Sequence, residues 1–327
     1  MKMSSPDISN PKGLQRPLGS KPPLIVIVGP TAVGKTGISI QIAERLDGEI
    51  VSADSRLFYR GMDIGTAKPT LQERQGVPHH LIDVADPADT WNLAVFQQAA
   101  AAAIAAIHAR GHLPFLVGGT GQYIHAVMHA WTPPVTSPDA NLRAELEAQA
   151  EENGYLALHK ELQVLDPAAA NKIDPRNLRR TIRALEVIRL TGKKFSEQGG
   201  KTANPYRLLT IGLTLPRPEL YARLDARIED MFAGGLLDEV QRLLASGCSP
   251  DLPTMSAIGY RECNQVLQGT MTVEQAKVEM RRLTRIFVRR QANWFKLEDP
   301  SIHWFEADKT KLVEIEEAIQ AFLKADG

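Results

Sequence analysis

The chain has 327 residues, of which 43% are hydrophobic and 23% are charged. This composition can bury a substantial core, so it excludes a disordered chain. No apolar run approaches the roughly 20 residues that a membrane-spanning helix needs, and the polar, Pro- and Gly-rich residues 1–21 lack the apolar stretch of a secretory signal. We expect a cytoplasmic protein with no membrane partner and a flexible tail at residues 1–21. Two cysteines, Cys248 and Cys263, are too few for a disulfide scaffold or a zinc site, so we expect both reduced.

The charges are unevenly distributed, although the formal net charge is zero. Residues 171–297 hold 22 of the 38 Lys and Arg but 13 of the 38 Asp and Glu, which makes this segment +9 and the remainder −9. A basic half on a neutral protein is typical of a nucleic-acid-binding face. The alternative is that the surplus arginines only keep the protein soluble.

Short apolar runs indicate strands at residues 24–28, 50–53, 80–84 and 114–117, and a long Ala-rich helix at 94–110 precedes the fourth. Strands separated by helices predict a parallel, doubly wound α/β sheet. The next strand, at residues 208–215, comes only after a long stretch whose pattern is purely helical. We therefore expect a core domain at residues 22–129 and 206–327, and an inserted helical domain at 130–205.

Helical patterns resume after residue 215. One apolar helical face ends at a glycine pair, and a second helix is expected at residues 272–297 with arginines at every fourth position on a separate stripe. A last strand at 302–305 and a terminal helix complete the pattern. The residues that define these helices are Leu220, Leu224, Ile228, Met231, Gly234, Gly235, Met280, Leu283, Phe287, Trp294, Arg281, Arg285 and Arg289.

The strongest chemical signal is a P-loop between the first strand and the helix that follows it: Gly29-Pro30-Thr31-Ala32-Val33-Gly34-Lys35-Thr36. Its glycines let successive backbone N–H groups point at phosphate oxygens, and the helix N-terminus adds partial positive charge. Lys35 supplies a cation and Thr36 a hydroxyl for Mg²⁺. An ordinary Gly-rich turn is the alternative, but the strand and helix on either side disfavour it. The loop alone does not distinguish ATP, GTP and a diphosphate.

Two further segments follow strands at the same sheet edge, where ligands of open α/β sheets bind. Asp54 follows the second strand and can serve as a base, or it can simply cap the next turn. Thr120 lies in the second Gly-rich turn, which holds a ligand or is only a tight connection. The irregular residues 62–69 are either a functional loop or a passive one. His79 and His80 point to opposite faces of a strand, so we do not expect a metal there.

Arginines in two places can bind phosphates. Arg223 and Arg227 lie one helical turn apart and could donate bidentate hydrogen bonds to a diphosphate, unless Asp225, Glu229 and Asp230 pair with them. Within the insertion, Arg179, Arg180 and Arg183 lie off the apolar helical face and bind nucleic acid phosphates or form a solvated surface.

The sequence Asn171-Lys172-Ile173-Asp174 matches the guanine-specificity motif N-K-x-D of GTPases. That motif should end an apolar strand, whereas here it lies between two predicted helices and before Pro175. We therefore exclude a GTPase.

In combination, the motifs resemble those of the tRNA dimethylallyltransferases, also called tRNA isopentenyltransferases, over most of the chain. The resemblance is carried by the P-loop, Asp54-Ser55 with Tyr59, residues 62–69, Pro78-His79-His80-Leu81, Val117 to Gly121 with Tyr123, Arg183 to Val187, Ile258 to Glu262, Thr284-Arg285, Arg289-Arg290-Gln291 and Trp294-Phe295. One departure is Leu57, which stands where many members have Gln.

This resemblance implies a P-loop kinase-like core with a helical insertion that contacts tRNA. It also implies transfer of a dimethylallyl group from dimethylallyl diphosphate to N6 of the adenosine 3′ to the anticodon, in tRNAs that read codons beginning with U. The expected cofactor is Mg²⁺ at Thr36, the partner is the tRNA anticodon stem-loop, and the expected oligomeric state is a monomer.

By resemblance, the catalytic residues are Asp54, Lys35, Thr120 and Arg227, and the donor diphosphate binds to residues 29–36. Asp54 would accept the N6 proton and Thr120 would position the adenosine. The residues expected to contact tRNA are Asp54, Ser55, Arg56, Leu57, Thr120, Arg143, Arg179, Arg180, Thr181, Ile182, Arg183, Ser256, Ala257, Ile258, Gly259, Tyr260 and Arg261.

Two other classes compete with this interpretation. A P-loop small-molecule kinase explains the P-loop but gives no use to the basic segment or the insertion. A nucleic-acid-binding ATPase explains the arginines, but residues 115–117 end in Gly118, so the Asp that would assist hydrolysis after an apolar strand is missing there.

Overall fold

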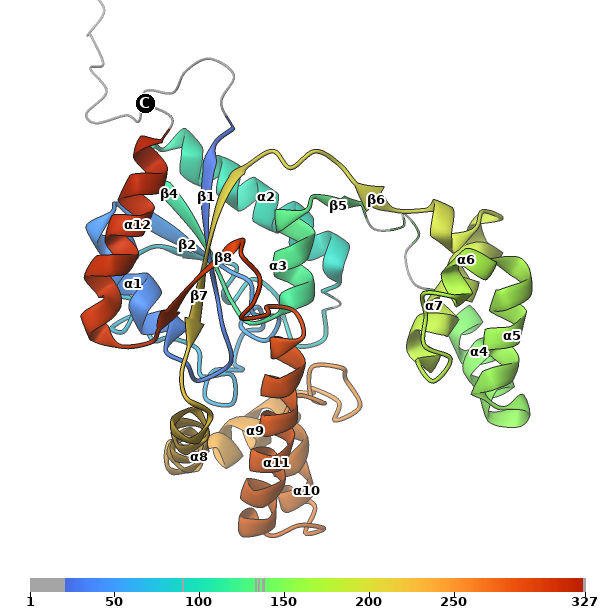
Figure 1. Ribbon diagram of the computed structural model, residues 1–327. Coiled ribbons are helices and arrows are strands. Elements are labelled where there is room, and N and C mark those ends of the chain that lie inside the picture. The colour runs from blue at the N-terminus through green and yellow to red at the C-terminus, as the bar shows by residue number, and fades with distance from the viewer. Residues whose placement is uncertain (1–20, 90, 133, 135, 137–138, 326–327) are drawn as a thin grey trace, which may run out of the picture. The chain divides into compact units, whose positions relative to one another are not determined.

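The computed structural model describes residues 21–325 except residues 90, 133, 135, 137 and 138 (Figure 1). The chain divides into two compact units, Met1–Met128 with Asn204–Gly327, and His129–Ala203. We call the first the core unit and the second the helical unit, and describe each by itself. The tail expected at residues 1–21 lies, apart from Lys21, outside the described residues.

The core unit contains a six-stranded sheet in the order β3-β2-β4-β1-β7-β8, and every neighbouring pair of strands is parallel. Helical segments follow β1, β3, β4 and β7, and turns at residues 53–78 connect β2 to β3, so each connection returns to the same end of the sheet, as a parallel arrangement requires. The expected parallel α/β core is confirmed. The strands are β1 (Pro23–Val28), β2 (Gly48–Ser52), β3 (His79–His80), β4 (Leu113–Val117), β7 (Arg207–Thr214) and β8 (Ile302–Glu306).

Both faces of the sheet are buried, which explains the continuous apolar run of β1. Leu24, Val26 and Val28 belong to one hydrophobic cluster, and the alternate residues Ile25 and Ile27 belong to another. The first cluster includes side chains of α2 (Leu93–Ala109) and α3 (Gly121–Met128). The second includes side chains of α1 (Lys35–Arg45) and α12 (Leu312–Lys324), which follows η2 (Lys309–Lys311), so helices cover the sheet on both sides (Figure 1).

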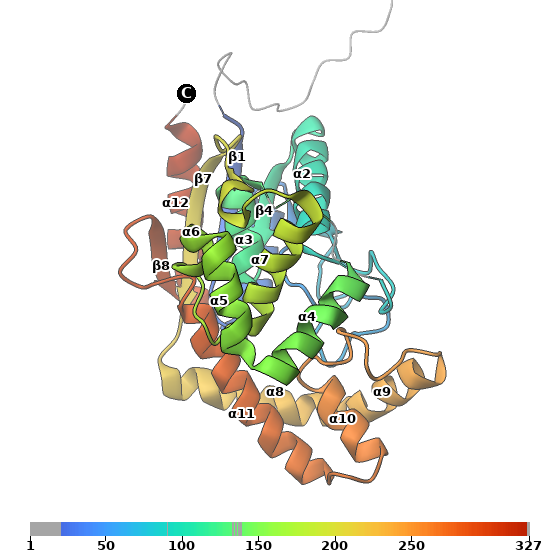
Figure 2. The same ribbon diagram turned by 90° about the vertical axis from the view of Figure 1, so that its right-hand side faces the viewer.

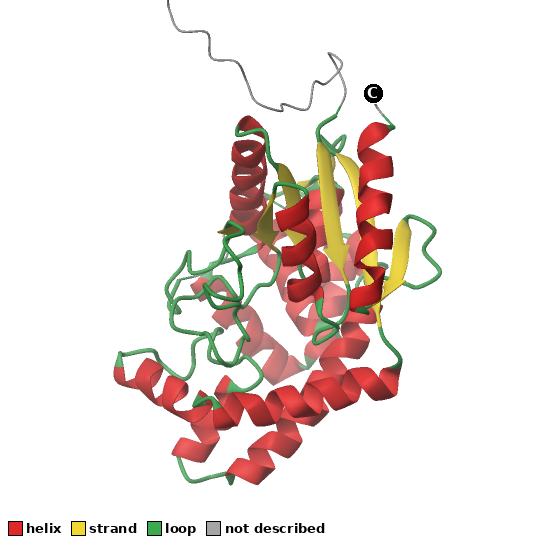
Figure 3. Cartoon of the chain, turned by 90° about the vertical axis from the view of Figure 1, so that its left-hand side faces the viewer, coloured by secondary structure: helices red, strands yellow, loops and turns green. Residues whose placement is uncertain are grey.

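Four helices gather beyond the carboxyl ends of the strands, in the lower part of Figure 3. They are α8 (Arg217–Ala233), α9 (Leu236–Ala245), α10 (Tyr260–Leu267) and α11 (Val273–Ala292). The glycine pair separates α8 from α9 as expected, because Gly235 adopts a left-handed conformation with φ 92°. Side chains of α8, α10 and α11 form part of the wall of the candidate site described below.

The helical unit consists of α4 (Ala140–Asn153), α5 (Tyr155–Leu165), α6 (Pro167–Ala170), α7 (Leu178–Thr191) and η1 (Phe195–Glu197), and Figure 2 shows its four α-helices. It also has a two-stranded antiparallel ladder of β5 (Trp131–Thr132) and β6 (Gly200–Lys201) (Figure 1). Leu146, Leu158, Leu162 and Leu185 lie in its own hydrophobic core. A separate core is what allows such a segment to be a domain of its own.

Three expectations about elements were wrong. The strand expected at 80–84 stops at His80, because Leu81 and Asp83 have φ of 61° and 57°, which no strand accommodates. The helix expected at 272–297 ends at Ala292, where Asn293 caps it. The insertion is not purely helical, since it contains β5 and β6. Within the described residues, no helix combines the length and apolar character needed to cross a membrane.

Candidate active site

The carboxyl edge of the sheet brings together three loops that are far apart in the sequence. Ala53 N donates to Val117 O at 2.8 Å, and Gly118 N donates to Ile27 O at 3.2 Å, so the ends of β1, β2 and β4 are level. The P-loop follows β1, Asp54 follows β2, and the turn at residues 118–121 follows β4. The sequence predicted this shared edge, and the structure places all three loops there.

The P-loop is shaped by a glycine and a lysine. Gly29 has φ 149°, and a Cβ at this position would lie 2.5 Å from the carbonyl oxygen of Leu213 on the neighbouring strand. Lys35 Nζ folds back to donate to Gly29 O at 3.0 Å and to Pro30 O at 2.8 Å. The ammonium therefore lies inside the loop, at the N-terminus of α1, where an anion is most favoured.

Lys35 is electrostatically coupled to the other expected catalytic groups. Burial lowers the pKa of Lys35 to about 8, against the opposing effect of the Asp54 carboxylate, and the Arg227 guanidinium lowers this pKa further. Burial also lowers the pKa of Arg227, which Asp54 partly offsets. One carboxylate and two cations thus share a single, partly desolvated site.

Asp54 has two roles at once. Its Oδ1 accepts from Arg56 N at 3.0 Å, and its carbonyl accepts from Leu57 N at 3.2 Å, so it begins a turn as the capping alternative proposed. The same side chain also lines a cavity and acts on Lys35 and Arg227. This bond fixes the orientation of the carboxylate. Its second oxygen, Oδ2, accepts no hydrogen bond from the described residues.

Thr120 and Gln291 connect the loops. Thr120 Oγ1 accepts from Ser55 N at 3.2 Å, which joins the turn after β4 to the turn after β2. Gln291, on α11, accepts from Thr31 N at 2.9 Å through Oε1 and donates to Gly119 O at 3.1 Å through Nε2. Sequence analysis assigned Gln291 no role beyond its place in the motif Arg289-Arg290-Gln291.

The cavity at this edge has a volume of about 310 Å³. One part of its wall is polar and includes Asp54, Thr120 and Arg227, and another part is apolar. The apolar part comes from α8 and α11, because Leu224, Ile228, Met231, Met280 and Phe287 line it. The remaining lining residues are Thr31, Ser55, Arg56, Gly65, Thr66, Ser256, Ala257, Ile258, Tyr260 and Thr284.

Arg227 is not neutralised by the acidic residues of its own helix. Asp225 pairs with Arg285 of α11 at 2.7 Å, and Glu229 pairs with Lys277 at 2.8 Å and also with Arg281. Arg227 instead donates to the carbonyl of Thr66 at 3.3 Å. The guanidinium is therefore available at the cavity wall.

Arg223 lies on the same helix but differs from Arg227. It pairs with Glu219 at 2.8 Å and reaches Val33 O of the P-loop at 3.5 Å. Sequence analysis proposed both Arg223 and Arg227 as partners for the diphosphate. Of these two, Arg227 lines the cavity and Arg223 does not.

Glu239 of α9 organises the loop at residues 62–69, and sequence analysis missed it. Its carboxylate is 2% exposed and accepts from Asp63 N, Ile64 N and Gly65 N at 2.8–3.2 Å. It also accepts from the Tyr260 hydroxyl at 2.7 Å. An acidic residue on the apolar face of α9 was the available signal, since a buried carboxylate requires such donors.

The expected tRNA contacts of the core unit fall into two groups. Ser55, Arg56, Ser256, Ala257 and Ile258 line the cavity. Tyr260 also lines it but is fully buried, with its hydroxyl bound to Glu239. Leu57 is half-buried, Gly259 N donates to Glu262 at 2.7 Å, and Arg261 is exposed and pairs with Glu262.

In the helical unit, a buried carboxylate binds two of the expected tRNA contacts. Glu186 is fully buried, and both Arg143 and Arg183 donate to it at 2.6–3.1 Å. The side chains of Thr181 and Ile182 are buried in the core of this unit. Arg179 and Arg180 are exposed on α7.

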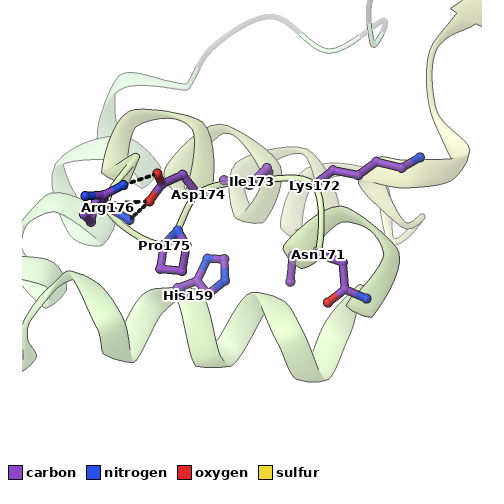
Figure 4. A pocket seen from close by; sticks show the side chains of 8 residues that line it. His159, Asn171, Lys172, Ile173, Asp174, Pro175 and Arg176 are labelled. Carbon is purple, nitrogen blue, oxygen red and sulfur yellow. Dashed lines mark hydrogen bonds and ion pairs between the residues drawn. The ribbon is translucent and has the colours of Figure 1, made fainter.

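The guanine-motif segment lies in the helical unit, in the connection between α6 and α7. Figure 4 shows Asn171 to Arg176 around a shallow pocket, with His159 of α5 below them and Asp174 bonded to Arg176. The Arg176 side chain lowers the pKa of Asp174 to about 2. This carboxylate pairs with an arginine at a helix junction and does not lie at a sheet edge, which confirms the predicted location of the motif between two helices.

Thr36 is suited to bind a metal ion that a phosphate ligand also binds. Thr36 is exposed at the first turn of α1, but the described residues contain no group of three or more His, Cys, Asp or Glu side chains suited to hold a metal. Mg²⁺ usually binds through few protein ligands together with substrate phosphates. His80 pairs with Glu49 at 2.6 Å, and His79 Nδ1 donates to Val77 O at 2.8 Å.

The P-loop on a parallel sheet, the carboxylate at a strand end and the half-apolar cavity define an α/β enzyme that acts on a phosphorylated substrate. Residues 57–298 match the family model described as IPP transferase, and the chain belongs to this family. These similarities do not favour a small-molecule kinase.

Similar proteins agree with this assignment. The chain is 56% identical to a tRNA dimethylallyltransferase from Roseiflexus sp. (strain RS-1), over 89% of this chain and 95% of that protein. Its structure is similar to the tRNA isopentenylpyrophosphate transferase of Bacillus halodurans, with a TM-score of 0.70, 44% identity, and 94% and 98% of the two chains covered. It is also similar to a eukaryotic dimethylallyltransferase acting on tRNA, with a TM-score of 0.72, 29% identity, and 92% and 77% covered.

Proposed function

We propose that this protein transfers a dimethylallyl group from dimethylallyl diphosphate to N6 of the adenosine 3′-adjacent to the anticodon, in tRNAs that read codons beginning with U. The observation that carries the proposal is the cavity at the sheet edge. Asp54 and Arg227 lie on the polar part of its wall, and apolar side chains line another part. A substrate with a charged head and a short hydrocarbon tail matches such a wall. Family membership supports the same activity.

The P-loop holds the diphosphate leaving group in this proposal. Backbone N–H groups within residues 29–36, other than Pro30, which has none, and Thr31, whose N–H Gln291 binds, surround its oxygens together with the Lys35 ammonium, and Arg227 approaches from α8. Charge grows on the diphosphate as the C1–O bond breaks, so preorganised donors at this place lower the barrier. The five-carbon tail lies against Leu224, Ile228 and Phe287.

Asp54 acts on the adenine. The N6 amine is a weak nucleophile; its nitrogen forms a bond to C1 of the dimethylallyl group while the C1–O bond breaks. Asp54 accepts the N6 proton, and diphosphate leaves with the electrons of the broken bond. Thr120, which is fixed next to Ser55, positions the base. A base in a tRNA loop costs less to unstack than one in a duplex.

Thr36 and the diphosphate oxygens would hold Mg²⁺, which adds positive charge at the leaving group when bound. The exposed hydroxyl at the start of α1 supports this assignment. We further propose that the protein is a cytoplasmic monomer.

For the tRNA, each unit offers its own surface. In the core unit, Ser55, Arg56 and residues 256–258 surround the cavity that would receive the flipped adenosine. In the helical unit, the exposed Arg179 and Arg180 are suited to phosphate contacts, which position a nucleic acid without reading its sequence. Arg143 and Arg183 support this surface through Glu186.

The direct test mixes the protein and Mg²⁺ with labelled dimethylallyl diphosphate and unmodified tRNA, and in parallel with labelled ATP. Label is expected on the adenosine next to the anticodon, with release of one diphosphate per group transferred. ATP turnover without labelling of tRNA would overturn the proposal.

Asp54→Ala tests the base. We expect turnover to fall by at least ~10²-fold, because the N6 proton loses its acceptor, while tRNA affinity stays nearly unchanged. Single-turnover kinetics and a filter-binding titration measure the two quantities separately. Turnover like that of the wild type would remove Asp54 as the base.

A further inference from the structure

Gln291 occupies a position that the catalytic groups do not explain. It is 5% exposed, and both polar atoms of its side chain are used on loops that carry site residues. Its Oε1 accepts from the backbone of Thr31 in the P-loop at 2.9 Å. Its Nε2 donates to the carbonyl of Gly119, the residue before Thr120, at 3.1 Å.

These bonds complete a chain of contacts across the site. Gln291 connects Thr31 to Gly119 through its two hydrogen bonds. Thr120, which follows Gly119, accepts from Ser55 N at 3.2 Å, and Ser55 follows Asp54. The chain runs from the loop that would hold the diphosphate to the carboxylate that would accept the proton. A single side chain of α11 thus links the two halves of the reaction.

The fit around Gln291 is tight. A Cβ on residue 119 would overlap Gln291 Nε2, and a Cβ on residue 121 would overlap the Trp294 side chain. Gly119 and Gly121 therefore allow the end of α11 to approach the turn after β4. Along α11, Met280, Thr284 and Phe287 line the cavity at helical spacing from Gln291, so one face of the helix serves the site.

We propose that Gln291 is a positioning residue that fixes the P-loop relative to the Gly118–Gly121 turn, and so sets the separation between the diphosphate and the accepting base. The inference rests on the proposed prenyl transfer. In this arrangement the N–H of Thr31 is bound by Gln291, and the remaining amides of the loop serve the diphosphate. Small displacements of reacting groups have large kinetic effects.

Gln291→Met keeps the length of the side chain and removes both hydrogen bonds. We expect kcat to fall by roughly tenfold or more, because the two loops lose their common tether, while the KM for tRNA stays within about twofold. Gln268→Met makes the same replacement at an exposed position of the core unit and is expected to match the wild type. An unchanged kcat in Gln291→Met overturns the inference.

Gln291→Glu tests the donor half alone. Its carboxylate still accepts from Thr31 N but presents an oxygen to the carbonyl of Gly119. We expect kcat to fall at least as far as in Gln291→Met, because a carboxylate oxygen faces the carbonyl of Gly119 without a hydrogen between them, while the KM for tRNA stays within about twofold. A kcat like that of the wild type contradicts the positioning role.

Hydrogen exchange of the full chain separates this inference from the proposed function. In Gln291→Met, peptides from residues 29–36 are expected to exchange faster, while those from β1 keep their wild-type rate. Faster exchange in both would show general loosening and overturn a local role. If the wild type transfers no prenyl group, the proposed function fails, whereas this comparison still decides whether Gln291 fixes the P-loop.

Discussion

The two units of the chain use their arginines in opposite ways. In the core unit, Asp225 and Glu229 are bound by cations of α11, which leaves Arg227 at the cavity wall. In the helical unit, the buried Glu186 binds Arg143 and Arg183, which leaves only Arg179 and Arg180 exposed among the expected arginines. Which cations the nearby acids bind, and not the number of arginines, decides which arginines can meet a ligand.

The largest expected effect tests the core side of this comparison. Arg227→Ala should lower kcat/KM for dimethylallyl diphosphate by roughly 10²-fold, because a preorganised cation at the leaving group is lost. The unfolding free energy should stay within about 1 kcal/mol of the wild type, since removing Arg227 leaves no carboxylate without its ion-pair partner. Steady-state kinetics and urea denaturation measure both.

Arg223→Ala is the matched control on the same helix. Its side chain is exposed and paired with Glu219, so we expect a loss of about threefold or less. If the two substitutions have equal effects, or if Arg227→Ala weakens only tRNA binding, the assignment of Arg227 to the diphosphate is wrong.

The next effect concerns stability in the helical unit. Glu186→Ala should lower the unfolding free energy by about 3 kcal/mol at pH 7, because two arginines lose the carboxylate that binds them. Glu145→Ala removes an exposed partner of Arg189 and should cost under about 1 kcal/mol. Equal costs for both would show that burial of Glu186 adds nothing.

The effect of Glu186→Ala should also depend on pH. Burial raises the pKa of Glu186, but hydrogen bonds from Arg143 and Arg183 outweigh burial, so the pKa lies below its ordinary value. A depressed pKa stabilises the fold above the unfolded value of about 4.3 and loses this contribution as pH falls through the folded value. The difference between mutant and wild type should therefore shrink in urea titrations repeated at acidic pH.

Lys35 offers a smaller effect with a defined pH range. Its pKa of about 8 means that the free enzyme loses this cation as pH rises through 8. We expect kcat/KM for the donor to fall by about tenfold per pH unit above that value. In Lys35→Arg the side chain stays charged, so kcat/KM for the donor should no longer fall above pH 8, whatever the maximal rate of this variant. A wild-type profile that is flat to pH 9.5 would contradict the lowered pKa.

The smallest effect tests the exposed arginines of the helical unit. The double substitution Arg179→Ala with Arg180→Ala should weaken tRNA binding by roughly fivefold at moderate salt and reduce the slope of log affinity against log salt by about 1 to 2. The turnover of saturated enzyme should not change. Binding titrations at several salt concentrations measure this slope, and an unchanged slope would exclude phosphate contacts at these positions.

The sequence was sufficient for the sheet and for the shared edge of the site. Apolar runs fixed five of the six strands closely, and parallel strands end at one edge, so the P-loop, Asp54 and Thr120 had to be neighbours. The third strand was predicted too long, because the apolar run at residues 80–84 continues through Leu81 and Asp83, whose left-handed conformations end the strand at His80. Backbone conformation at single non-glycine residues depends on packing that the local sequence does not encode.

The supporting residues could not be found in the same way. Gln291 reaches Thr31 across 260 positions, and Glu239 reaches Asp63 across 176. Nothing near these residues in the sequence identifies their partners, because tertiary packing alone brings them together. For Arg227 the local sequence is misleading, because its neighbours Asp225 and Glu229 pair with cations of α11 instead, whereas Arg183 pairs with Glu186 only three residues away.

The short ladder of β5 and β6 has an evolutionary consequence. Trp131 pairs with Lys201, so the chain enters and leaves the helical unit at adjacent points. The six-stranded sheet takes no strand from between these points. Lineages can therefore lengthen, shorten or replace the segment between them without altering the strand order of the sheet, so the two units can diverge separately.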